Sequence, residues 1–213
     1  MPLNVLSTPR SAPHQAFFKD LEIAAADTPR LLHSIAYHRE HVASFFMLHP
    51  SHLMRFCRGA ENPVIEALFE AGVDFATVET KCQELHSLGQ SLANPDTRVF
   101  RTLIEHGLDP KKPMWESDYQ KTSVMMHCVE LDKVEPFAVL LDAKVDSDLP
   151  NYAIKRKSFR CVEYLCASNR AYRKKPEILT LAEENDAFKS FLEQLSLDRE
   201  TPAASRPGSR PRL

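Results

Sequence analysis

The segments EALFEAGVD (66–74) and RTLIEHGLD (101–109) repeat one pattern of apolar residues and glycine. In each, a leucine is followed by a second large apolar residue and, four positions after the leucine, by a glycine. A glycine just past a helix readily adopts the left-handed conformation that ends it. The pattern therefore predicts two short helices that end in the same kind of turn.

Three further segments align with these two, so that 41–49, 64–72, 99–107, 136–144 and 161–169 can be stacked with matching apolar columns. Positions three and four residues apart lie on one face of a helix. Each segment is therefore predicted to be a short helix with a single buried stripe. The second aligned position holds Val42, Ile65, Phe100, Phe137 and Val162, and the fifth holds Phe45, Leu68, Leu103, Leu140 and Leu165.

A shorter apolar segment precedes each of these helices, which predicts a chain of helix pairs. The chain has only five glycines, and no alternating apolar segments joined by hairpin turns stand out, so the expected class is all-α. Further helices are expected at 15–25 and 177–195, as caps on the two ends. The shorter segments are 31–36, 53–57, 85–88, 124–129 and 152–154.

The pattern resembles the ankyrin repeat, whose helix pairs open with T-P-L-H-x-A and close on a glycine turn. Remnants of that opening are Thr28-Pro29, Leu85-His86 and Thr122-Ser123-Val124. The resemblance implies an ankyrin-like helix-pair repeat solenoid of about four to five repeats with terminal capping helices. Helix ends at 49, 72, 107, 144 and 169 are less regular than the roughly 33-residue spacing of that family. An unrelated helix-pair solenoid stays open as an alternative.

Composition divides the chain into three parts. Residues 14–196 are expected to form the repeat domain, whereas 1–13, with three prolines, and the Pro-, Arg- and Ser-rich tail 197–213 are expected to be disordered. The net charge of −2 indicates no global attraction to nucleic acid or membrane. Without a signal peptide or a long apolar run, a cytoplasmic location is expected, with the nucleus or the cytosol of a host cell as alternatives.

No motif points to catalysis or to a bound cofactor. Five histidines cluster at 33, 38, 41, 49 and 52. No two of them are four residues apart, which is the spacing that a zinc site on one helix requires. We therefore expect them on solvated helix faces or at turns. Cys128 follows His127, but neighbours on a helix point in different directions, so a cysteine nucleophile is not expected. The resemblance gives His86 a structural role between adjacent loops.

A basic stretch between residues 155 and 175 is the first candidate for function. Glu163 is the only acidic residue in that span. Such stretches bind nucleic acid or the phosphates of phosphoinositides, or form a solvated face. The candidate polyanion-binding residues are Lys155, Arg156, Lys157, Arg160, Arg173, Lys174 and Lys175.

The expected loop 110–121 is the second candidate, and we favour it. It holds the only tryptophan of the chain, Trp115, together with Glu116, Asp118 and Tyr119. Aromatic residues that fill a pocket of a partner dominate binding energy. Alternatively, Trp115 folds back on its own repeat. The sequence thus predicts a non-enzymatic scaffold, an adaptor, inhibitor or effector, that binds a partner protein through loops 75–83 and 110–121 and the concave face.

Overall fold

Helices make up most of the computed structural model, which describes residues 12–24, 27–81, 86–117 and 120–197. The expected all-α class is confirmed at this level, with one exception, a two-stranded hairpin. The expected disordered segments lie almost entirely outside the described residues; the first helix already begins at Ala12. None of the described helices has the length and apolar character needed to cross a membrane.

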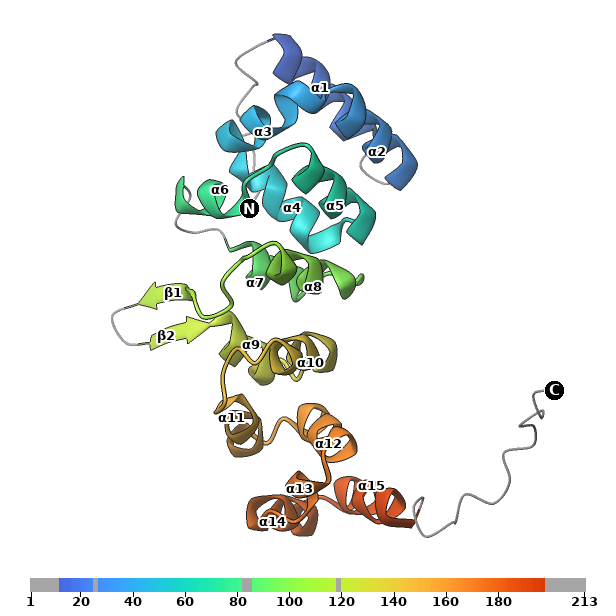
Figure 1. Ribbon diagram of the computed structural model, residues 1–213, viewed down its shortest axis with the longest axis vertical. Coiled ribbons are helices and arrows are strands. Elements are labelled where there is room, and N and C mark those ends of the chain that lie inside the picture. The colour runs from blue at the N-terminus through green and yellow to red at the C-terminus, as the bar shows by residue number, and fades with distance from the viewer. Residues whose placement is uncertain (1–11, 25–26, 82–85, 118–119, 198–213) are drawn as a thin grey trace, which may run out of the picture.

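Five consecutive helix pairs stack so that their helices form two columns (Figure 1). The first column contains α4 (Pro50–Gly59), α7 (Ser87–Ser91), α9 (Val124–Glu130), α11 (Leu149–Arg156) and α14 (Pro176–Glu184). The second column contains α5 (Asn62–Glu70), α8 (Arg98–Glu105), α10 (Val134–Asp142), α12 (Phe159–Ser168) and α15 (Asp186–Leu197). Successive helices of the second column pack on one another from α5 to α15.

The predicted glycine turns are confirmed. Gly72 and Gly107 have φ angles of 81° and 91°, and neither would meet a neighbouring atom if it carried a Cβ, so the backbone conformation alone favours glycine. The next backbone N–H, that of Val73 or Leu108, donates to the carbonyl of Leu68 or Leu103. The same hydrogen-bond pattern follows α9, α10 and α11, where non-glycine residues take the left-handed position. These residues are Asp132, Lys144 and Lys157, with φ between 49° and 55°.

The apolar columns predicted from the sequence form the core between the stacked helices. All ten residues at the second and fifth aligned positions are buried, and Leu103 and Leu140 are completely inaccessible. At the sixth position, Phe69, Ile104 and Leu141 are partly exposed, whereas Phe46 and Cys166 are buried. The buried stripe is therefore narrower in α5, α8 and α10 than in the other two helices.

The N-terminal end differs from the predicted alignment. It contains α1 (Ala12–Ala24), α2 (Thr28–Tyr37) and α3 (Arg39–Leu48). Helix α2 packs on α5 of the second column, whereas α3 packs on α4 of the first. Segment 41–49 is thus not equivalent to the other four. Helices of both columns bury an apolar stripe, and Val42 and Phe45 of α3 are fully buried. The stripe alone therefore did not show to which column α3 belongs.

Two insertions project from the side of the first column (Figure 1). One is α6 (Phe75–Lys81). The other is an antiparallel hairpin of β1 (Pro113–Ser117) and β2 (Gln120–Ser123), where the sequence predicted a loop. These strands are only five and four residues long and lack an Asn-Gly or Asp-Gly turn, so the usual sequence signal for a hairpin is absent.

The C-terminal end also differs from expectation. The predicted cap helix 177–195 is two helices, α14 and α15, separated at Asn185. The side-chain Oδ1 of Asn185 accepts a hydrogen bond of 3.0 Å from the backbone N–H of Phe188 and so caps the second helix. A short helix, α13 (Arg170–Arg173), precedes them.

Candidate protein-binding surfaces

A buried carboxylate connects the two insertions. Lys112 Nζ lies 3.2 Å from Glu79 Oε2, and so joins the segment before β1 to α6. Glu79 is only 4% exposed, and its Oε1 accepts a 2.6 Å hydrogen bond from the backbone N–H of Ser87 at the start of α7. A buried carboxylate is tolerated only when it is paired and hydrogen-bonded. The contact therefore links α6, within the predicted binding segment 75–83, to Lys112, within the predicted segment 110–121.

His86 lies beside this ion pair and caps α7. Its Nδ1 accepts a 3.3 Å hydrogen bond from the backbone N–H of Gly89. Burial lowers the pKa of His86, and the charge of Lys112 lowers it further, against the opposing effect of Glu79. A neutral ring keeps Nδ1 available as an acceptor. These contacts fit the structural role expected of His86.

The hairpin contains Trp115 and Glu116, two of the four predicted partner-binding residues. Their backbones in β1 pair with Thr122 and Lys121 of β2. Asp118 and Tyr119 lie outside the described residues. Met114 approaches α7 so closely that a Cβ at Gly89 would lie 2.4 Å from its Cε atom. The base of the hairpin is thus seated on the first column.

Several basic residues of the stretch contact other groups of the same chain. Arg156 pairs with Glu130 of α9 and lies over the Tyr152 ring, and Lys157 pairs with Glu184 of α14. The Arg156 guanidinium lowers the pKa of Glu130. Arg173 donates to the carbonyls of Cys166 and Leu195, at 2.6 and 3.2 Å, and Lys175 donates to Asn151 Oδ1 at 3.0 Å.

Three of the seven candidate residues make neither an ion pair nor a side-chain hydrogen bond within the described part of the chain. These are Lys155, Arg160 and Lys174, all exposed. They lie on α11, on α12 and just after α13, respectively. The predicted polyanion-binding residues are therefore not gathered on one element.

The five histidines of the cluster differ in burial. His38 and His49 are 8% and 5% exposed and stand at the single-residue breaks on either side of α3, which agrees with the expected location at turns. His33 is exposed on α2, which agrees with the expected solvated helix face. His38 Nε2 donates to Asp20 Oδ2 at 2.8 Å. Burial lowers the pKa of His52 to about 4, helped by the charge of Arg55. In the described residues, no group of three or more His, Cys, Asp or Glu side chains could hold a metal ion.

Burial favours the protonated form of the four cysteine thiols that belong to the described residues. Burial raises the pKa of Cys57 and Cys128 to about 12 and that of Cys166 to about 11, and it also raises the pKa of Cys161. A nucleophilic cysteine needs a stabilised thiolate. These four thiols lack that property.

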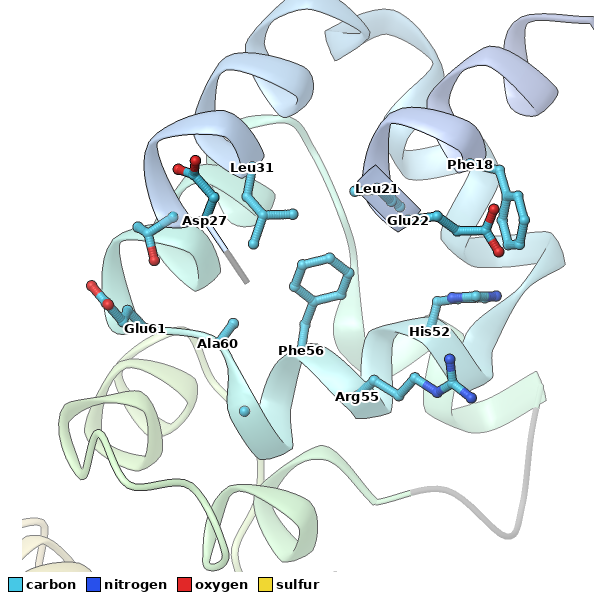
Figure 2. Close-up of a pocket in the computed structure, with 12 residues that line it drawn as sticks. Phe18, Leu21, Glu22, Asp27, Leu31, His52, Arg55, Phe56, Ala60 and Glu61 are labelled. Carbon is cyan, nitrogen blue, oxygen red and sulfur yellow. The ribbon is translucent and has the colours of Figure 1, made fainter. Parts of the chain in front are cut away.

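A pocket that was not predicted from the sequence lies between α1, the start of α2 and the later part of α4 (Figure 2). Its volume is about 560 Å³. Apolar side chains form its base, with Phe56 at the centre, and charged groups stand at its ends. No local pattern signals such a pocket, because its walls come from three helices whose relative placement depends on tertiary packing.

Comparison with family models, with curated proteins and with solved structures gave no match to this chain.

Proposed function

We propose that this chain is a divergent ankyrin-type repeat scaffold that binds a partner protein through α6, the β1–β2 hairpin and the adjoining first-column helices. The observation that carries the proposal is the buried contact of Glu79 with Lys112 and Ser87, which holds both insertions in one arrangement on one side of the stack. Stacked helix pairs offer an extended surface for recognising another protein.

Preorganisation is the physical reason to place binding there. Association is weakened when flexible loops must be ordered, so a fixed hairpin gains affinity. The hairpin carries Trp115, a residue type that often dominates interface energy. Binding also accounts better than catalysis for the four protonated cysteine thiols and for the capping role of His86.

The polyanion-binding alternative has less support. Four of its seven basic residues, Arg156, Lys157, Arg173 and Lys175, already contact groups of the same chain. Phosphate binding would have to compete with these contacts or rely on the remaining three. A strong decrease of affinity with salt would be its signature.

The test is affinity capture from lysate of the source cells with quantitative mass spectrometry, followed by affinity measurement on the purified partner. Replacing Trp115 and Tyr119 together by alanine is expected to weaken binding by at least about 2 kcal/mol, roughly thirtyfold, with helical circular dichroism unchanged.

Replacing Lys155, Arg156 and Lys157 by glutamine is the comparison variant. We expect a smaller loss of affinity that disappears at high salt, because exposed charges mainly steer association. If the glutamine variant abolishes binding and the aromatic variant does not, the polyanion alternative replaces the proposal.

A further inference from the structure

The pocket of Figure 2 has an apolar base formed by two phenylalanines and two leucines. Phe18 and Phe56 are partly exposed, whereas Leu21 and Leu31 behind them are 6% and 5% exposed. Phe56 points into the space between the latter two (Figure 2). Burying apolar side chains against such a base is favourable, by about 25 cal/mol for each Å² removed from water.

The two ends of the pocket differ in charge. Asp27 and Glu61 stand at one end, and Arg55 stands at the other beside His52 (Figure 2). Asp27 is already paired with Arg30, at 3.2 Å, and also accepts a hydrogen bond from the Arg30 backbone N–H. Glu61 and Arg55 have no ion pair within the described ranges of the chain. Arg98 interacts electrostatically with Glu61 without forming an ion pair, and both Glu61 and Arg55 are exposed, so an occupant can reach their charges.

Glu22 is a further carboxylate in the lining. It lies beside Phe18, on the same side as Arg55 and His52 (Figure 2). It has no ion pair among the described residues, so it partly offsets the charge of Arg55. The Arg55 end is thus mixed, whereas the Glu61 end is acidic.

The separation of the two ends sets the length of the occupant. Arg55 lies on α4, which ends at Gly59, whereas Ala60 and Glu61 are extended. Four helical steps of about 1.5 Å and two extended steps of about 3.4 Å separate the backbones of Arg55 and Glu61 by at most about 13 Å. An extended peptide covers about 13 Å in four steps from one residue to the next, at roughly 3.3–3.6 Å each, so that three residues lie between the two ends. An occupant that spans the pocket would thus place about three apolar residues between its oppositely charged side chains.

We propose that this pocket binds a short extended segment of a partner protein in which apolar residues are flanked by a basic residue, facing Glu61, and an acidic residue, facing Arg55. Charge complementarity at the two ends gives the segment its orientation, and the contact with Phe56 gives most of its affinity. The pocket is separate from the hairpin, so this binding site goes beyond the proposed function and does not depend on it.

Fluorescence anisotropy with three labelled peptides tests the proposal on the full chain. The peptides GKLFLEG, GKLFLKG and GELFLEG differ only in their flanking charges. We expect GKLFLEG to bind with a Kd at least tenfold lower than either of the others. Equal binding of all three, or no saturable binding of any, would overturn the proposal.

An exposed charge provides the decisive variant, because it is not needed for folding. Arg55→Glu makes both ends of the pocket acidic and is expected to shift the preference from GKLFLEG to GKLFLKG by at least tenfold. The matched control is Arg58→Glu, which introduces the same change on an exposed α4 residue outside the pocket lining and should keep the original preference. An unchanged preference in Arg55→Glu excludes this pocket as the binding site.

Two further measurements distinguish peptide binding at the pocket from binding at the hairpin and from self-association. The Trp115→Ala, Tyr119→Ala variant is expected to bind GKLFLEG like the unaltered chain, so loss of partner binding at the hairpin and loss of peptide binding at the pocket are distinguishable. Light scattering of the unaltered chain is expected to show no self-association that GKLFLEG reverses. If the chain self-associates and GKLFLEG reverses this association, a second copy of the chain is the occupant and the proposal is wrong.

Discussion

Removal of the Glu79 side chain tests the contact that organises the predicted binding face. In Glu79→Ala, the backbone N–H of Ser87, a fully buried residue, loses its acceptor. An unsatisfied buried donor costs about 1–3 kcal/mol. The lost ion pair adds no more than about 1 kcal/mol, since the Lys112 side chain is 44% exposed and screened by water. The total expected destabilisation is about 1–4 kcal/mol.

Urea denaturation followed by circular dichroism measures this cost. Lys112→Met should lose about 1 kcal/mol, because it leaves the buried carboxylate with only the hydrogen bond from Ser87. The backbone N–H groups of β1 should exchange hydrogen faster in both variants than in the unaltered chain. Lys111→Met, at the exposed neighbouring position, is the control and should stay within about 0.5 kcal/mol. A loss below about 0.5 kcal/mol in Glu79→Ala would refute the reasoning.

Two other predictions concern the core and the response to pH. Leu103→Ala should lower the free energy of unfolding by about 2–5 kcal/mol, whereas Leu131→Ala, at a leucine that is 47% exposed, should cost less than about 1 kcal/mol; similar losses would contradict the stacked core. Because the folded-state pKa of His52 is about 4 and its unfolded value is 6.5, the unfolded state binds the proton first, so stability should fall as pH decreases from about 6.5 to 4. His52→Gln should make this decrease smaller by up to about 3 kcal/mol, and His33→Gln, at an exposed histidine, should not; identical pH profiles for both variants would exclude His52 as a cause.

Local sequence patterns were sufficient to predict most of the helices and two of the turns that end them. The stripe through Leu68, Leu103 and Leu140 predicted both the helices and their buried faces, because three- and four-residue spacing has the same meaning in any helix. Gly72 and Gly107 marked two helix ends, because the left-handed conformation is a property of the residue itself. The same turn at Asp132 and Lys157 was missed, since those residues adopt it only within the folded chain.

Local patterns did not determine which helices are neighbours. The stripes of α2 and α3 look alike in sequence, yet only α2 packs on α5. The hairpin was missed for a related reason, since strands of four and five residues are defined by their pairing and not by their composition.

The sequence by itself thus determined the helical class, the buried stripes and the glycine turns, all of which depend on residues within one or two helical turns. Only the tertiary structure decided which groups the charged side chains contact. It buried Glu79 against Lys112, separated Arg156 from Lys157 by giving them different acidic partners, and left Arg55 and Glu61 at opposite ends of one pocket. The physical reason is that an ion pair or a pocket wall requires groups from distant parts of the chain, which approach each other only when the helices stack.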